Sequence, residues 1–213
     1  EEANKARRSQ WSEATEDLKK AIELRPAANF RDEYELALVQ LAAENTAGYQ
    51  QACGDLLNQF GKTTDSSAAS FAAWTCALSA ASDVAWSEVV ALAERAVKTA
   101  GGDVSLSHTA LGAALYRAGR FDQAVLQLTD ADRRMTQADA TPLVSPAYAR
   151  FFLAMAHHRL DHQDEAQQWL EKAVSWKKQY LEGASPAAAA AIPWVRQVTL
   201  DLLEKETRAL LGD

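Results

Sequence analysis

The stretch AHHRLDH, residues 156–162, holds three of the four histidines of this chain. His158 and His162 lie four residues apart with Asp161 between them, so these side chains could ligate a metal ion. Zinc, however, requires three or four converging ligands, and the chain has no HExxH motif. A repeat that runs through the chain places His157 at a packing position and His162 in a turn. His158 and His162 therefore need not share a continuous helix, and we expect no metal site.

Motifs for catalysis are missing as well. GxSxG is absent, and His108, the remaining histidine, also falls on a repeat position. Gly101–Gly102 lacks the lysine and the spacing of a phosphate-binding loop, and the chain has no HRD or DFG motif. The sequence disfavours a triad assembled across several hairpins, although such a triad would leave no local motif. We expect no enzymatic activity and no cofactor.

Composition indicates a helical protein. The chain has 213 residues, of which 48% are hydrophobic and 44 are alanine, and runs that alternate apolar and polar residues are short. The net charge is −7 and the basic residues are scattered, which argues against a nucleic-acid partner. No apolar run approaches the roughly 18 residues that a membrane span needs, and no signal peptide is visible. Cys53 and Cys76 lack CxxC spacing, so we expect two buried thiols and a reducing compartment.

A stripe of small and large apolar residues recurs along the chain. Ala124 is followed by Leu128 and Ala131, a spacing of four and three that makes one face of a helix. Copies begin at four further anchors, which are Ala14, Ala52, Val89 and Ala166. The intervals are 38, 37, 35 and 42 residues, and the copy at Ala52 is broken by a polar residue at its third position, Gln59. Such intervals are typical of an array of helical hairpins.

Residues 105–138 resemble a tetratricopeptide repeat (TPR), whose pattern is W-x2-L-G-x2-Y…A-x3-F…P. Six residues fill family positions: Leu111, Gly112, Gly119, Phe121, Ala124 and Leu128. The resemblance implies an all-α fold, a right-handed α-α superhelix of about four to five hairpins with a C-terminal capping helix. It also explains the glycine within a helix, because Gly112, like Ala77 and Ala154 in other copies, allows two helices to approach closely.

Departures from the repeat predict how the chain is divided. The two prolines in 135–146 mark an insertion between hairpins, and 183–193 form a second break. Counting back from Ala14 leaves only residues 1–8 for a leading helix, so the first repeat is truncated. We expect repeats over 1–182, followed by a linker and capping helix over 183–213. The capping helix would turn one face to the last hairpin, with Trp194, Val198, Leu202 and Ala209 near it.

A narrower resemblance covers about residues 9–176. Segments such as FAAWTCALSA and AMAHHRL…DEA…WL are similar to the TPR tails of large planctomycete signalling proteins with serine/threonine kinase or WD-repeat domains. Asp161 stands where that lineage tends to place glycine. The resemblance implies a bacterial, cytoplasmic interaction module, and a chain opening EEANKARRSQ is expected to be a piece of a longer protein.

The TPR resemblance also implies a concave groove lined by the leading helices of the hairpins. The candidate partner-binding residues by this register are Trp74, Tyr116, Arg117, Tyr148, Phe151, Met155, His158 and Arg159. Aromatic residues at these positions are more often interior packing than binding surface. Arg117, His158 and Arg159 are harder to bury, and Arg117 and Arg159 occupy the same place in adjacent repeats. They are therefore the better candidates to contact an acidic or phosphorylated protein segment.

Two functions fit these observations. The first is a scaffold that binds a peptide or partner protein in the groove, without nucleic acid or membrane as partner. The second is a structural or self-association spacer, whose groove is filled by its own insertion at 135–146 or by another copy. The sequence does not determine the oligomeric state.

Overall fold

A computed structural model of the chain describes residues 2–24, 29–100, 104–137, 144–182 and 193–212. Every regular element in those ranges is a helix, so the predicted all-α fold is confirmed. The α-helices are α1 (Glu2–Glu23), α2 (Phe30–Ala42), α3 (Thr46–Phe60), α4 (Ser66–Ala77), α5 (Trp86–Thr99), α6 (Ser105–Arg117), α7 (Phe121–Met135), α8 (Pro146–Arg159), α9 (Gln163–Glu182) and α11 (Trp194–Leu211), and a short 3-10 helix, η1 (Ala80–Ser82), follows α4.

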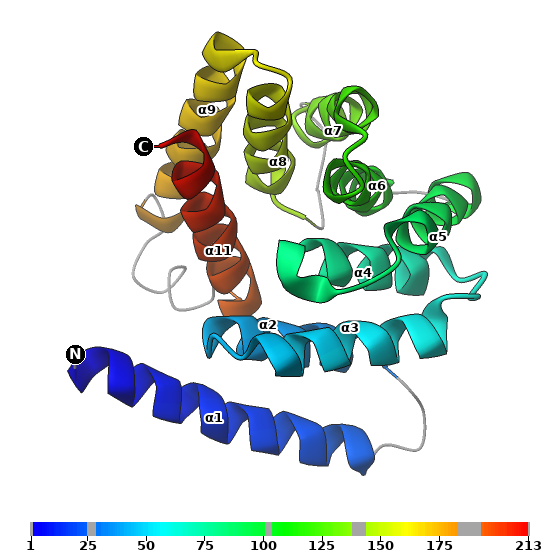
Figure 1. The fold of residues 1–213 in the computed structure, drawn as a ribbon, viewed down its shortest axis with the longest axis vertical. Helices are drawn as coiled ribbons and strands as arrows, with labels where there is room; N and C mark the ends of the chain where they lie inside the picture. Colours follow the sequence, from blue (N-terminus) through cyan, green and yellow to red (C-terminus); the bar gives the residue numbers. More distant parts are fainter. Residues whose placement is uncertain (1, 25–28, 101–103, 138–143, 183–192, 213) are drawn as a thin grey trace.

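Four hairpins follow one another in the described ranges: α2–α3, α4–α5, α6–α7 and α8–α9 (Figure 1). The first helix of each hairpin, here called the leading helix, contacts the leading helix of the next hairpin. The trailing helices α5 and α7 also pack on the leading helices α6 and α8 that follow them. This stacking forms a helical solenoid in which each hairpin covers the apolar face of its neighbour.

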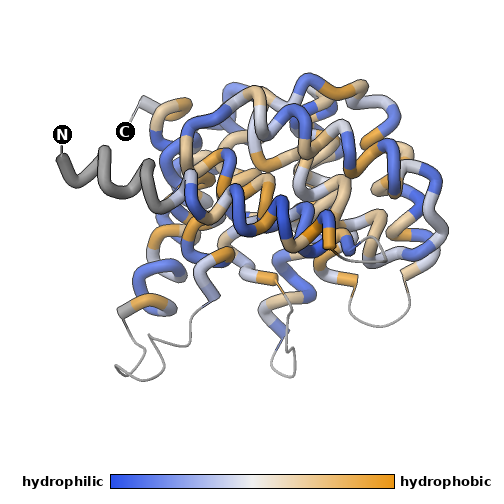
Figure 2. The backbone as a smooth tube through the Cα atoms, turned by 90° about the horizontal axis from the view of Figure 1, so that it is seen from below, coloured by the Kyte–Doolittle hydropathy of each residue, from blue (hydrophilic) through white to orange (hydrophobic). Residues whose placement is uncertain are grey.

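The trailing helices are held in place by the predicted stripes. Three residues of α7, Ala124, Leu128 and Ala131, are fully buried, and the equivalent residues of α5 and α9 are at most 2% exposed. Figure 2 shows the same arrangement in the coloured helices, each of which carries both hydrophilic and hydrophobic residues. These are amphipathic helices that share one core.

The stripe of α3 begins at Tyr49 and not at Ala52, which corrects the predicted anchor. Asn45 caps α3 with its side chain, which places Tyr49 four residues after the cap, as Val89 and Ala124 are in α5 and α7. Tyr49, Cys53 and Leu56 have the same spacing of four and three, and all are fully buried. Polar Gln59, which breaks the pattern counted from Ala52, is exposed.

Gly112 lies where α6 and α7 approach closely, as predicted. A Cβ atom at Gly112 would lie 2.4 Å from Cγ of Leu128 and 3.3 Å from its backbone nitrogen. The turn that follows contains Gly119 at a φ of 75°, and the corresponding turn between α8 and α9 contains Asp161 at a φ of 60°. The left-handed conformation explains why glycine is the usual residue there.

Residues 2–8 do not form a separate leading helix, because α1 runs without a break from Glu2 to Glu23. The stripe at Ala14, Leu18 and Ala21 is only partly buried, and α1 packs on α2. The ring of Trp11 also lies 6.0 Å from that of Trp194, at the start of α11.

Connections between hairpins agree with the positions of the prolines. The helix α7 ends at Met135 and α8 begins at Pro146, where the Ser145 side chain accepts a hydrogen bond from the Ala147 N–H. Half of the predicted insertion, residues 138–143, and most of the predicted linker, residues 183–192, lie outside the described residues. The division of the chain at residue 182 stays a prediction.

Candidate interaction groove

The face formed by the leading helices α2, α4, α6 and α8 is called here the leading-helix face. The helix α11 lies against it, in contact with α8 and α9 at one end of the solenoid and with α2 at the other (Figure 1). The capping helix therefore packs on the last hairpin, as the sequence predicts, but also spans to the first described hairpin.

The buried face of α11 differs from the predicted one. The residues with at most 1% exposure are Thr199, Leu200, Leu203 and Thr207, whereas Trp194 is 38% exposed and Ala209 is exposed. The prediction assumed contact with one hairpin only. Because α11 contacts elements on two sides, its buried face is rotated away from Trp194 and Ala209.

Aromatic side chains form the floor of the leading-helix face. Trp74 stacks on Tyr148 with ring centroids 5.2 Å apart and meets the edge of Phe152 at 6.0 Å. Phe152 also contacts Tyr116 at 5.6 Å, which joins α4, α6 and α8 in one cluster. Trp74, Tyr116 and Tyr148 are at most 6% exposed. The structure thus brings together these three predicted residues, but as buried packing under α11.

The repeat register predicts Phe151 and Met155 at the groove but not Phe152. All three are fully buried, so burial alone does not separate them. The spacing of four, three and four residues from Tyr148 through Phe152 and Met155 to Arg159 indicates the face that these residues share.

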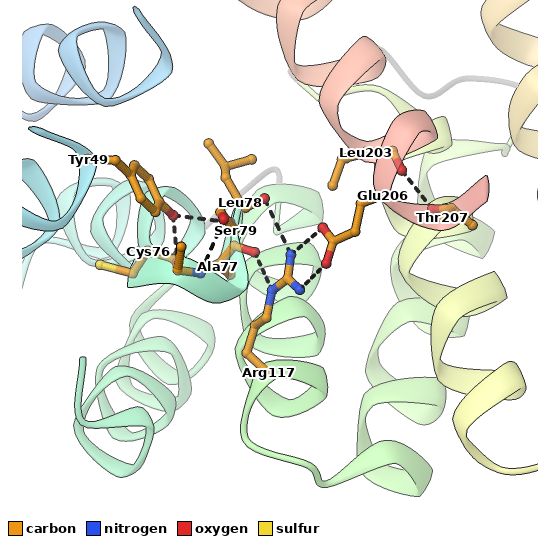
Figure 3. A network of polar contacts seen from close by, with 10 residues as sticks. Tyr49, Cys76, Ala77, Leu78, Ser79, Arg117, Leu203, Glu206 and Thr207 are labelled. Carbon is orange, nitrogen blue, oxygen red and sulfur yellow. Dashed lines mark hydrogen bonds and ion pairs between the residues drawn. The ribbon is translucent and has the colours of Figure 1, made fainter. Parts of the chain in front are cut away.

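Arg117 is the central polar residue of the leading-helix face (Figure 3). Its Nε donates to the carbonyl of Ala77 at 2.8 Å, and Nη2 donates to the carbonyl of Leu78 at 3.3 Å. Nη1 and Nη2 donate to the two carboxylate oxygens of Glu206 on α11, in a bidentate pair. The guanidinium carbon also lies 5.4 Å from the ring centroids of Tyr116 and Phe152.

Arg117 is predicted from its charge to be hard to bury, yet its side chain is only 4% exposed. Arg117 is buried because its guanidinium is paired with protein groups. A charged side chain leaves water only when contacts within the protein replace its hydrogen bonds to water. Two helix-end carbonyls, one carboxylate and two rings supply those contacts.

Arg159 and His158, by contrast, lie in the last turn of α8 and are less buried than Arg117. Arg159 is exposed, and His158 is partly exposed with its Nδ1 3.1 Å from Oε1 of Gln163. Burial raises the pKa of Tyr116, and a hydrogen bond with Arg159 and the charge of Arg117 oppose that rise. The two arginines therefore both act on the Tyr116 hydroxyl, from adjacent leading helices.

Further polar contacts hold α11 along its length. The Thr199 hydroxyl donates to the carbonyl of Val195, so the Tyr34 hydroxyl on α2 is the donor in its 3.1 Å contact with Thr199. From α9, Lys177 binds Asp201 at 2.6 Å and Glu204 at 2.7 Å. Burial alone would raise the pKa of Glu204, but hydrogen bonds from Lys177 and Arg208 outweigh it and lower that pKa.

A pocket of about 270 Å³ remains where the start of α11 meets the leading helices. Its walls carry aromatic residues from α2, α4 and α8 together with two arginines. The lining residues are Arg31, Tyr34, Glu35, Phe71, Trp74, Leu106, Val144, Tyr148, Pro193, Val195 and Arg196.

Tyr49 is a second residue whose role the repeat pattern does not predict. Its hydroxyl donates towards the carbonyls of Thr75 and Cys76, at 2.7 and 3.0 Å, and accepts from the N–H of Ser79 (Figure 3). These contacts satisfy carbonyls at the end of α4, next to those that Arg117 binds. Cys53 and Cys76 are free and buried beside it, as predicted.

The histidines of AHHRLDH pack around the turn between α8 and α9. His157 and His162 have their Nδ1 atoms 3.4 Å apart. Burial and the neighbouring His162 lower the pKa of His157. In the part of the chain that the structure describes, no three histidine, cysteine or acidic side chains converge as a metal site would require.

Comparisons with known proteins agree with this architecture. Residues 147–180, which cover most of α8 and α9, match the sequence profile of the tetratricopeptide repeat. The fold is similar to a crystal structure of nearly identical TPR-like repeats, ascribed to a kinesin light chain of Podosopora anserina. The TM-score is 0.52 at 19% identity, over 85% of this chain and 94% of the other. No curated protein has a matching sequence.

The chain thus has a TPR-like solenoid fold, as its sequence predicts. The tetratricopeptide match and the structural similarity support a protein–protein interaction scaffold in general terms, and this fold is typically not catalytic. Among the helices in the described ranges, none is long and apolar enough to cross a membrane.

Proposed function

We propose that this protein is an interaction scaffold that binds an acidic segment of a partner protein on the leading-helix face. One observation carries the proposal: that face already accommodates a helix, α11, with a carboxylate bound to Arg117 by both oxygens. A face that recognises Glu206 in this way offers the same contacts to an acidic side chain of another protein.

The chemistry of the face favours an acidic partner. Arg117 and Arg159 end adjacent leading helices and both act on Tyr116, although the chain as a whole carries a net charge of −7. Together they form a local positive strip on an acidic protein. Such a strip attracts carboxylates or phosphorylated residues and disfavours partner segments that are basic or neutral. Arg159 is exposed and would make the first contact.

The setting of the scaffold rests on sequence resemblance. Similarity to the TPR tails of planctomycete signalling proteins supports a module of a larger bacterial signalling protein that acts in the cytoplasm. Nucleic acid is not expected as a partner because the basic residues are scattered, and membrane is not expected because no apolar run is long enough to span one.

Charge reversal at Arg159 tests the proposal. The immobilised chain is incubated with lysate and with the other domains of the protein that contains it, and captured proteins are identified by mass spectrometry. Arg159→Glu should abolish capture, because it reverses the exposed charge of the strip. Lys98→Glu, on the trailing helix α5, is the matched control and should leave capture unchanged. If the Arg159→Glu and Lys98→Glu variants capture the same proteins in equal amounts, the interaction does not use the leading-helix face at Arg159.

A structural spacer is the second candidate, and one observation favours it. Leu200 and Leu203 of α11 are fully buried, so part of the leading-helix face serves as core. If that is its whole function, neither lysate nor the neighbouring domains should yield a protein whose capture depends on Arg159. Sedimentation velocity of the purified chain then tests self-association directly.

A further inference from the structure

We propose that α11 is a built-in competitor for the leading-helix face, and that a partner binds there as an amphipathic helix with a carboxylate at the place of Glu206. The proposal rests on the proposed function and adds the form of the partner and the means of control. In this structure α11 covers the contacts that a partner would need.

Arg117 is positioned by the solenoid and not by α11. The carbonyls of Ala77 and Leu78 and the rings of Tyr116 and Phe152 all belong to the hairpins. These four contacts orient the guanidinium before any carboxylate arrives. Such preorganisation is the property of a binding site, since the arginine loses little further freedom when it pairs.

The contacts of α11 are those of a docked segment more than those of a core helix. Only Leu200 and Leu203 among its hydrophobic residues are buried, whereas α8 buries ten residues. Polar contacts with Tyr34, Arg117 and Lys177 add to the attachment. The other hydrophobic residues of α11 that pack against the core are only partly buried, namely Val195, Val198, Leu202, Leu210 and Leu211. An ion pair at this depth adds little stability over apolar packing, but it discriminates strongly between segments with and without the carboxylate.

The spacing of the docked residues defines the partner. Leu200, Leu203 and Glu206 follow one another at intervals of three, on one face of the helix. The partner segment would therefore be a helix with two aliphatic residues and a carboxylate at this spacing. As α11 is tethered, its effective concentration is high, and a free segment competes only when α11 is weakened or the segment binds more tightly.

Hydrogen exchange on the full chain tests whether α11 opens by itself. We expect the amides of α11 to exchange faster than those of α8, through a local opening that leaves the hairpins folded. Glu206→Ala should accelerate exchange in α11 at least tenfold and leave α4 and α9 unchanged. Lys205→Ala is the matched control, because that neighbouring side chain is 79% exposed, and it should change nothing. If α11 exchanges only together with α6 and α8, it is part of the core and the proposal is overturned.

A synthetic fluorescent peptide of residues 194–211 tests recognition in trans. It should bind the full-length Glu206→Ala chain at least tenfold more tightly than the unmodified chain, by fluorescence anisotropy. A peptide with Glu206→Gln should bind the same variant at least tenfold more weakly than the native peptide. Equal binding of the two peptides would overturn the role of the carboxylate.

The two proposals fail in different ways. A partner whose capture depends on Arg159 while α11 stays fully protected against exchange would support the proposed function and overturn the role of α11. An α11 that opens and exchanges with the peptide, with no Arg159-dependent partner, would support the competitor and count against the positive strip as the docking site.

Discussion

At the residue scale, glycines act in two distinct ways in this fold. Gly112 is required by distance, because a Cβ atom would lie 2.4 Å from Leu128 Cγ across the α6–α7 contact. Gly119 is required by conformation, because its φ is 75°. Each requirement predicts a different result of substitution.

Replacing Gly112 should destabilise the protein although it improves helix propensity. Gly112→Ala removes a propensity penalty of about 1 kcal/mol, but overpacking against Leu128 should cost about 1–3 kcal/mol, so the free energy of unfolding should fall. Gly54→Ala in α3 is the control, since nothing lies within 4 Å of its Cβ position, and it should stabilise. Urea denaturation measures both. A stabilised Gly112→Ala variant would contradict the close contact.

Replacing Asp161 by glycine should stabilise the protein, whereas replacing Gly112 should destabilise it. Asp161 occupies the left-handed conformation at a φ of 60°, where Gly119 stands in the preceding hairpin. Asp161→Gly should raise the free energy of unfolding by about 0.5–1 kcal/mol, because glycine adopts this conformation without steric cost. Thermal denaturation followed by circular dichroism measures the change, and Gly119→Ala should lower stability by a similar amount. No gain in Asp161→Gly would mean that the aspartate stabilises the turn in another way.

At the scale of elements, an ion pair between residues 89 positions apart in the chain joins α6 to α11. Arg117→Ala should lower the free energy of unfolding by roughly 3 kcal/mol, since Glu206 and two carbonyls lose their donor. The double variant Arg117→Met, Glu206→Met should recover most of that loss, because it removes both charges and keeps apolar volume. Additive effects in a double-mutant cycle would show that the two side chains do not interact.

The turn between α8 and α9 should make stability depend on pH. Burial and His162 lower the pKa of His157 below the ordinary value of 6.5, so the folded state binds the proton less tightly than the unfolded state. The contribution of His157 to stability is therefore fully present above pH 6.5 and is lost as the pH falls through the lowered pKa. His157→Gln should make stability less dependent on pH between about 6.5 and 5, as measured by urea denaturation. An unchanged slope would exclude His157 as the cause.

At the scale of the whole molecule, α11 joins helices that a simple solenoid keeps apart. In such arrays each repeat contacts only its neighbours, yet α11 contacts both α2 and α8. Changes at α11 should therefore be felt at both ends of the leading-helix face.

Leu203→Ala tests this link. It removes a fully buried side chain and should cost about 2–5 kcal/mol in the free energy of unfolding. Hydrogen exchange should accelerate in α2 as well as in α8. Leu126→Ala is the control, since that side chain is 69% exposed, and it should change stability by less than about 0.5 kcal/mol. Acceleration confined to α8 and α9 would show that the contact with α2 is unimportant.

The sequence by itself determined the local structure of this protein. The spacing of Ala124, Leu128 and Ala131, repeated in α5 and α9, predicted the trailing helices because helical period and burial are properties of neighbouring residues. Gly112 predicted the close approach of α6 and α7, since only a contact explains a glycine there. The register of α3 was missed because Tyr49 is large where the other copies have small or β-branched residues.

Only the tertiary structure decided what covers the leading-helix face. The pairs Arg117–Glu206 and Tyr34–Thr199 join residues far apart in the chain, and no periodicity encodes where a helix after a long connection will dock. Arg117 was predicted at the face from its place in the repeat, but its burial depends on a carboxylate, two carbonyls and two rings from three other helices and the end of its own. Those contacts form only when the hairpins stack. In a shorter piece of the chain the guanidinium of Arg117 would lack these partners and would stay in water.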